Sequence, residues 1–204
     1  MIKNIHCLAL NYKNVGIDNQ NPLYFLKSTS CITNPGGIVP YPSFGTNDVE
    51  VWTEVELGIV IGKDCLNIDS NNVHNYIKGF VVAGDITCKN IYSRDHHLGF
   101  SKARRGFCPV NNSPVFLDIR DGRELKMTTE INGKITQIGT TADMKFNPYE
   151  CVSYISKLVG LQKNDLIITG TPAGGENNVI NPKDKVKHTI EDIGEISYSF
   201  GDLK

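Results

Sequence analysis

Alternation between hydrophobic and polar residues indicates that strands dominate this chain. The clearest strand is expected over residues 50–61, whose alternate side chains fall on two faces. One face is mostly apolar and is predicted to lie in the core, whereas the other mixes polar and apolar groups. The mixed face carries Trp52, Glu54, Glu56, Gly58 and Val60. A second buried strand is expected over residues 79–83, where an apolar run ends at Gly84-Asp85.

Two hairpins are predicted further along the chain. Strands over 125–131 and 134–138 flank Asn132-Gly133, a dipeptide that favours a two-residue hairpin turn. Strands over 185–190 and 195–200 would form a terminal hairpin that turns at residues 191–194. A short buried strand over 166–169 leads into Gly170-Thr171-Pro172.

Helices are expected to be few and short. The best one spans 147–160, with Asn147 as N-cap, Pro148 in the first position and Glu150 completing a capping box. Its predicted apolar stripe is Val152, Ile155 and Leu158 or Val159. Shorter helices are expected from Asp69 or Ser70 to Tyr76, and over 87–96. These helices do not alternate regularly with strands, so the pattern favours a mixed α+β, mainly β fold over a doubly wound sheet or a TIM barrel.

The length of 204 residues corresponds to one domain, which we place at 1–204. Within it, residues 1–45 form an N-terminal strand and a candidate lid. The part over 19–41 is rich in Pro and Gly, which predicts turns and fits either a structured loop region or a mobile lid.

Composition narrows the functional classes. The net charge of −1 gives no support to a basic nucleic-acid surface or a polybasic membrane patch. The longest apolar runs are far shorter than a membrane span, and the N-terminus does not resemble a signal peptide. The six cysteines are scattered without a CxxC pair, which predicts reduced thiols in a cytoplasmic protein. No Gly-rich phosphate loop and no GxSxG motif is present.

Three carboxylates are the first candidates for chemistry. Glu54 and Glu56 point to the same side of one predicted strand, roughly 7 Å apart at the backbone, so both can approach one hard divalent cation. Asp85 ends another buried strand, where it can reach the edge of a pocket. Considered alone, Glu54 and Glu56 could equally be two exposed glutamates on a solvated strand face. Considered alone, Asp85 could equally be a turn residue that caps the next helix.

Two further segments suit an anionic ligand. In the loop over 169–175, backbone N–H groups and the Thr171 hydroxyl can hold a carboxylate, although its glycines also suit a tight turn. The cluster of Lys102, Arg104 and Arg105 supplies cations for an anion, and equally fits a solvated charge run.

Taken in order, these pieces resemble the catalytic domain of the fumarylacetoacetate hydrolase family. The resemblance covers nearly the whole chain and is closest to the short single-domain members. Its motifs are Leu10-Asn11-Tyr12, Phe25-Leu26-Lys27, Thr53-Glu-Val-Glu-Leu57, Gly84-Asp85-Ile-Thr87, Phe107-Cys-Pro109, Gly139-Thr-Thr-Ala-Asp-Met144 and Thr169-Gly-Thr-Pro-Ala-Gly174.

The resemblance implies a β-sandwich or β-roll, usually homodimeric, with a Mg²⁺ or Mn²⁺ site. By position, Glu54, Glu56 and Asp85 match the metal carboxylates, and the substrate-binding positions fall on Lys27, Thr171, Tyr12 and Gly170. The implied reaction is hydrolysis, decarboxylation or isomerisation of a small 2-oxo or β-diketo acid through a metal-stabilised enolate. The substrate would be of the acylpyruvate, oxaloacetate or hydroxymuconate type.

The chain departs from the family pattern at the positions whose side chains transfer protons. The family's His–Glu pair falls on Val15 and Asp18, and its catalytic lysine falls on Ala103-Arg104-Arg105. Valine cannot transfer a proton, and arginine holds an anion but stays protonated. We therefore name Arg104, Lys102 and Asp18 as candidate catalytic residues, with His96 and His97 as other replacements. The alternative is a catalytically weak homologue that binds metal and an oxo acid without efficient turnover.

Overall fold

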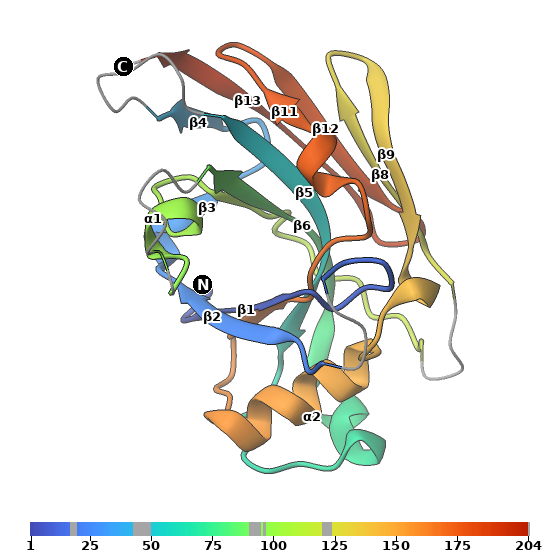
Figure 1. The fold of residues 1–204 in the computed structure, drawn as a ribbon. Coiled ribbons are helices and arrows are strands. Elements are labelled where there is room, and N and C mark those ends of the chain that lie inside the picture. The colour runs from blue at the N-terminus through green and yellow to red at the C-terminus, as the bar shows by residue number, and fades with distance from the viewer. Residues whose placement is uncertain (17–19, 43–49, 90–94, 96, 120–123, 204) are drawn as a thin grey trace.

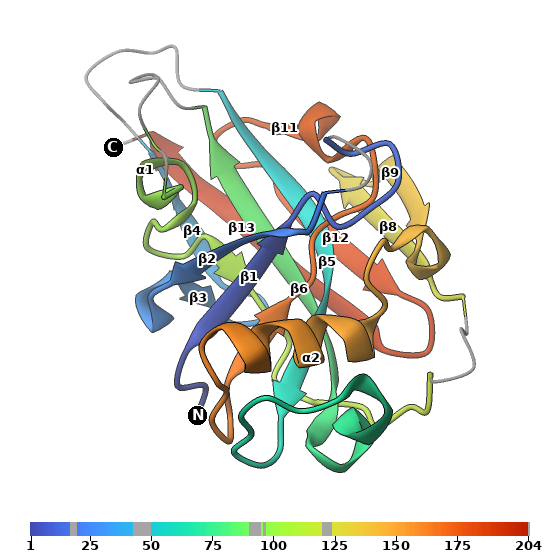
Figure 2. The same ribbon diagram turned by 60° about the horizontal axis from the view of Figure 1, so that its bottom comes forward.

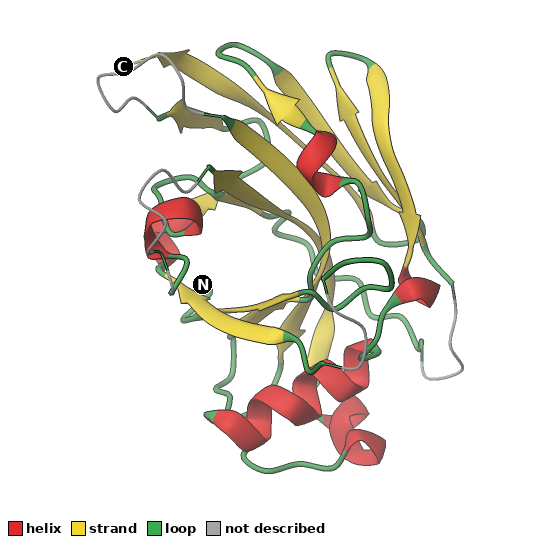
Figure 3. Ribbon diagram, viewed as in Figure 1, coloured by secondary structure: helices red, strands yellow, loops and turns green. Residues whose placement is uncertain are grey.

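The structure is a computed structural model that describes residues 1–16, 20–42, 50–89, 95, 97–119 and 124–203. Strands dominate it and helices are short, which confirms the mainly β fold class (Figure 3). No helix in these residues is long and apolar enough to cross a membrane. Asp18, His96 and most of the helix expected over 87–96 lie outside the described residues.

Within the described residues, a six-stranded sheet carries the site. Its long central pair is β5 (Val51–Ile61) and β6 (Ile77–Cys88), which are antiparallel. The order continues from β5 through β10 (Leu166–Ile168) and β1 (Ile5–Ala9) to the edge strand β2 (Leu23–Lys27), and β11 (Val179–Ile180) pairs with the start of β5. β10 is parallel to β1 and antiparallel to β5.

A five-stranded sheet packs against one face of the first sheet (Figure 1). In spatial order it contains β4 (Ile38–Tyr41), β13 (Gly194–Leu203), β12 (Lys185–Ile190), β8 (Lys126–Ile131) and β9 (Lys134–Thr140). β8 and β9 form the predicted hairpin, and Asn132 and Gly133 both have positive φ, as a type I′ turn requires. The terminal hairpin of β12 and β13 is also confirmed.

Helix α2 (Pro148–Leu158) crosses the lower end of the first sheet (Figure 2). The predicted capping box is present: Asn147 Oδ1 accepts from the N–H groups of Tyr149 and Glu150, and Glu150 accepts from the Asn147 N–H. Val152 and Ile155 are buried as predicted, but Leu158 and Val159 are about half exposed, so the apolar stripe ends earlier than expected.

The remaining elements are short. They are α1 (Gly99–Lys102), a small pair made of β3 (Ile32–Thr33) and β7 (Cys108–Pro109), and the 3₁₀ turns η1 (Thr29–Cys31), η2 (Ser70–Asn75), η3 (Thr141–Asp143) and η4 (Gly175–Asn177). The 3₁₀ turn η2, capped by Asp69, occupies the place of the helix predicted there.

Two hydrophobic clusters lie on opposite faces of the first sheet. The larger one fills the space toward the second sheet and α2, and contains the predicted core face of β5: Val51, Val55, Leu57, Ile59 and Ile61. The smaller one lies on the other face and includes Val60, Val81 and Ala83. All six cysteines are buried and unpaired. The candidate site lies on the face of the smaller cluster.

One predicted boundary is wrong. β6 does not end at Gly84-Asp85 but continues to Cys88, so Thr87 and Cys88 are in a strand and not in a helix. The cause is tertiary, because β5 offers backbone partners along this whole stretch, with Trp52 paired to Thr87 and Val51 to Cys88. A helix does follow, but it is the single turn α1 that begins at Gly99.

Candidate metal centre

Three carboxylates converge near the end of the β5–β6 pair at which β5 begins and β6 ends. Glu54 and Glu56 lie two residues apart on β5, and Asp85 lies directly opposite Glu54 on β6. Directly opposed residues in an antiparallel pair place their side chains close together on one face. Ligand oxygens from the three residues all lie within 4.8 Å of one another. The structure thus brings together the three residues named from the sequence as metal ligands.

Each carboxylate is oriented by a separate hydrogen-bond donor. The Trp52 indole N–H donates to Glu54 at 3.0 Å, and the backbone N–H of Gly170 donates to Glu56 at 2.6 Å. The ammonium group of Lys27, whose side chain is fully buried, is paired with Asp85 and also donates to the Phe107 carbonyl at 2.7 Å. Hydrogen bonds that metal ligands receive from residues that do not touch the ion fix the direction of the ligand oxygens.

Lys102 supplies a positive charge to the same cluster. Its Nζ lies 2.8 Å from both Glu54 Oε2 and Asp85 Oδ2, and 2.7 Å from the Thr87 hydroxyl. The side chain is only 10% exposed, and it is positioned by the single turn of α1. Lys102 therefore neutralises part of the negative charge that the three carboxylates concentrate here.

Burial and neighbouring charge shift the ionisation of these groups. Burial raises the pKa of Glu56 well above its ordinary value, and the nearby carboxylates of Asp85 and Glu54 raise it further. For Lys27 and Lys102, burial lowers the pKa, but the carboxylates beside them outweigh it, so the pKa of both ammonium groups is raised. Both lysines therefore carry a positive charge at neutral pH.

The loop after β10 forms one wall of the centre. Gly170 has φ of +89°, and a Cβ atom there would lie 3.2 Å from the Leu8 carbonyl oxygen, so glycine lets its N–H face Glu56. The neighbouring Thr171 lines the cavity, and its hydroxyl accepts from Gln137 Nε2 at 3.2 Å. Gln137 also donates to the Pro172 carbonyl at 2.8 Å, which ties this loop to β9.

The donor set fits a hard divalent cation. Three carboxylates on two paired strands supply the oxygen ligands that Mg²⁺ prefers in proteins. The centre lies at the floor of a cavity of about 270 Å³, which leaves room for a small ligand beside an ion. Glu54, Glu56, Asp85 and Lys102 supply the charges that line it.

Two residues named from the sequence lie elsewhere. Tyr12 is fully buried in the larger core, and its hydroxyl donates to Met127 Sδ at 3.3 Å, so it does not reach the cavity. Arg104 stacks on the Phe100 ring at 4.6 Å and donates to the Phe100 carbonyl. Lys102, two residues earlier, is the basic residue of this segment that enters the site.

Sequence reasoning missed several residues that shape the centre. Trp52 stands two residues before Glu54 on the same face of β5, and that spacing could have indicated its hydrogen bond. Leu98 lies four residues before Lys102, one turn away along α1, and lines the cavity above it. No local signal identified Gln137, whose contact with Thr171 depends on how β9 meets the loop after β10.

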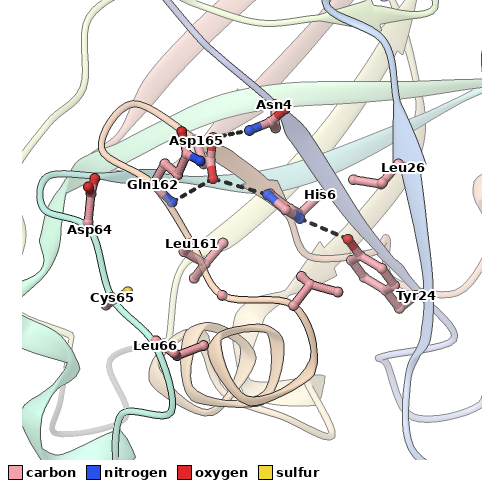
Figure 4. A pocket seen from close by; sticks show the side chains of 12 residues that line it. Asn4, His6, Tyr24, Leu26, Asp64, Cys65, Leu66, Leu161, Gln162 and Asp165 are labelled. Carbon is pink, nitrogen blue, oxygen red and sulfur yellow. Dashed lines mark hydrogen bonds and ion pairs between the residues drawn. The ribbon is translucent and has the colours of Figure 1, made fainter.

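A larger cavity, of about 540 Å³, lies between β1, β2 and the end of α2 (Figure 4). Its main polar feature is His6, whose ring nitrogens contact Tyr24 at 3.0 Å and Asp165 at 3.2 Å. Asp165 also accepts from Asn4 and from the Gln162 N–H. Among the described residues, a group of three side chains that could hold a metal ion occurs only in the cavity with Glu54, Glu56 and Asp85, which makes that cavity the better candidate for chemistry.

Comparison with known proteins gives one consistent result. The model of the fumarylacetoacetate (FAA) hydrolase C-terminal family matches residues 4–200. Oxaloacetate tautomerase YisK of Bacillus subtilis is 31% identical, with 98% of this chain and 70% of that protein aligned. The crystal structure of 5-carboxymethyl-2-hydroxymuconate delta-isomerase from Mycobacterium smegmatis is 26% identical, with a TM-score of 0.85 over 98% of this chain and 77% of that one.

A third comparison concerns the fold alone. Fumarylpyruvate hydrolase from Pseudomonas aeruginosa, solved in complex with Mn²⁺ and pyruvate, is 22% identical and has a TM-score of 0.84. The alignment covers all of this chain and 91% of that one.

Proposed function

The chain belongs to the fumarylacetoacetate hydrolase family, and we propose that it is a Mg²⁺- or Mn²⁺-dependent enzyme acting on a small 2-oxo or β-diketo acid. One observation carries the proposal: Glu54, Glu56 and Asp85 converge within 4.8 Å at the floor of a cavity that also holds a lysine. Two of the relatives are named as an oxaloacetate tautomerase and a 5-carboxymethyl-2-hydroxymuconate delta-isomerase, which supports this substrate class.

Each residue of the centre has its own role in this proposal. Glu54, Glu56 and Asp85 would hold the cation, which when bound supplies Lewis-acid stabilisation of the negative charge that develops on the substrate. Lys102 stays protonated and can donate hydrogen bonds to a substrate carboxylate or to an oxygen that gains charge. The Thr171 hydroxyl, held by Gln137, orients the same end of the substrate.

The experiment combines activity with metal binding. Oxaloacetate, acetylpyruvate and hydroxymuconate-type acids are supplied with Mg²⁺ or Mn²⁺, and products are followed by ¹H NMR and CO₂ release. Glu56→Gln should abolish activity and lower the Mn²⁺ affinity measured by calorimetry by roughly 100-fold or more. Loss of a residue that only hydrogen-bonds to a metal ligand already lowers metal affinity by roughly 10- to 100-fold. Glu50→Gln is the matched control, because Glu50 lies just before β5 and is 47% exposed at its side chain. Activity that survives chelation would refute the proposal.

A second candidate is a homologue that binds metal and an oxo acid with little turnover. The observation in its favour is that Val15, which cannot transfer a proton, lines the cavity. This candidate predicts Mn²⁺-dependent binding of oxalate with no product from any substrate above. Formation of CO₂, a tautomer or a cleavage product would exclude it.

We further propose that the enzyme is a homodimer, as the resemblance implies. Light scattering should give a mass near twice the 22.6 kDa of one chain. A monomeric mass at micromolar concentration would contradict this.

A further inference from the structure

The cavity above the carboxylates changes character between its floor and its mouth. Charged groups occupy the floor, whereas the mouth is formed by Ala9, Leu10, Val15, Leu23 and Leu98. Leu10 and Leu23 are 38% and 41% exposed, so they mark the opening to solvent. Among the lining residues that the structure describes, Lys102 is the one cation, and it lies at the floor, 2.8 Å from Glu54 and from Asp85. The residues described at the mouth thus offer an incoming ligand apolar contacts and no second positive charge.

Two of the mouth leucines occupy an unusual backbone conformation. Leu10 has φ of +63° and Leu98 has φ of +55°, a left-handed region that costs a residue with a Cβ roughly 1–2 kcal/mol. Such strain persists where the surrounding structure fixes it, and it is frequent at functional sites.

Leu10 and Leu98 are each fixed by neighbouring backbone. Gly16, itself at φ of +69°, packs so closely on Leu10 that a Cβ there would lie 2.9 Å from the leucine Cδ2. The Leu98 N–H donates to the Asp95 carbonyl at 3.1 Å, and the Leu98 carbonyl accepts from the Lys102 N–H at 2.9 Å. One turn of α1 therefore directs a cation to the floor and a leucine to the mouth.

We infer that this mouth selects 2-oxo acids whose distant end is apolar, such as an alkyl or aryl group, over dicarboxylates of the same length. The inference rests on the proposed function, because it requires the 2-oxo acid end of the substrate to lie at the carboxylate floor. A second carboxylate placed among these side chains would lose hydration without gaining a partner, which is costly. Each methylene group buried there should instead strengthen binding about fourfold.

Two inert probes of equal length test this selection. N-Butyl oxamate carries the 2-oxo acid head with an alkyl tail, and N-(3-carboxypropyl) oxamate replaces the terminal methyl with a carboxylate. Calorimetry with the Mn²⁺-loaded protein should show the butyl compound binding at least 10-fold more tightly. Because the readout is binding, it does not depend on which reaction the enzyme catalyses.

A matched pair of variants on β2 places the effect at the mouth. Leu23→Arg brings a cation to the opening and should reverse the preference, so that the carboxypropyl probe binds more tightly than the butyl probe. Leu26→Arg makes the same change three residues later, at a side chain that is 54% exposed and lines the other cavity (Figure 4). This control should keep the preference of the wild-type protein.

The outcomes separate the inference from the proposed function. Equal affinity for the two probes, tighter binding of the carboxypropyl probe to the wild type, or an equal effect of both arginine variants would overturn the inference alone. Failure of both probes to bind, or binding that is the same in Glu56→Gln, would overturn the proposed function and the inference with it.

Discussion

Acid should destabilise this protein through one buried histidine. His188 is fully buried behind the β5–β6 pair, on the face opposite the metal centre. Its Nε2 lies 3.1 Å from the Thr53 hydroxyl and 2.9 Å from the Tyr198 hydroxyl, and its Nδ1 lies 3.1 Å from the Thr129 hydroxyl. These hydroxyl partners are neutral and do not offset a charge on the ring. Burial therefore lowers the pKa of His188 from 6.5 to about 3.

The sign and the size follow from proton linkage. Because the pKa is lower in the folded state, the unfolded chain binds the extra proton, and stability that is present above pH 6.5 is lost as the pH falls toward 3. At pH 5.0 an unfolded histidine is almost fully protonated, whereas the buried one is neutral. The difference is about 2 kcal/mol of unfolding free energy at that pH, rising to about 5 kcal/mol below pH 3.

The assay is urea unfolding at pH 7.5 and pH 5.0 in EDTA, for the wild type and two variants. His188→Gln removes the imidazole, so its loss of stability between the two pH values should be smaller than that of the wild type by about 2 kcal/mol. Thr53→Val is the control, because it removes a partner hydroxyl and destabilises the fold but keeps the histidine. It should lose as much stability on acidification as the wild type does.

All other ionisable groups are the same in the three proteins, so their contributions to the pH dependence of stability cancel when the proteins are compared. If wild type and His188→Gln lose the same stability between pH 7.5 and pH 5.0, the reasoning from burial is refuted. A loss in Thr53→Val as small as in His188→Gln would assign the effect to the hydroxyl network instead.

Three further changes test other parts of the structure. Lys102→Met leaves Glu54 without a cation and Asp85 with Lys27 alone, so the unfolding free energy in EDTA should fall by about 3 kcal/mol or more, and Mn²⁺ should stabilise the variant more than the wild type. An equal Mn²⁺ effect on both proteins would contradict this. Gly170→Ala forces a Cβ into a left-handed position and should cost about 1–3 kcal/mol while weakening Mn²⁺ binding by calorimetry; unchanged affinity would show that the N–H on Glu56 is unimportant. Asn147→Ala removes the capping box of α2 and should cost about 1 kcal/mol by urea unfolding with activity retained, and lost activity would argue against a purely structural role.

Much of the local structure follows from the sequence because its signals act over a few residues. The two faces of β5, the Asn132-Gly133 hairpin and the capped helix after Asn147 each depend on side-chain periodicity or turn chemistry within one segment. The same-side placement of Glu54 and Glu56 is also local, since residues two apart on a strand share a face. These features could be stated from the sequence without knowing the rest of the chain.

Tertiary structure alone decided how the centre is completed. The register of β5 against β6 sets Asp85 opposite Glu54, and the same pairing extends β6 past the turn expected at Asp85. The route of α1 brings in Lys102 and leaves Arg104 on a phenylalanine, while Tyr12 is drawn into the core. Strand register and the packing of distant segments depend on contacts between residues far apart in sequence, and no short-range pattern encodes them.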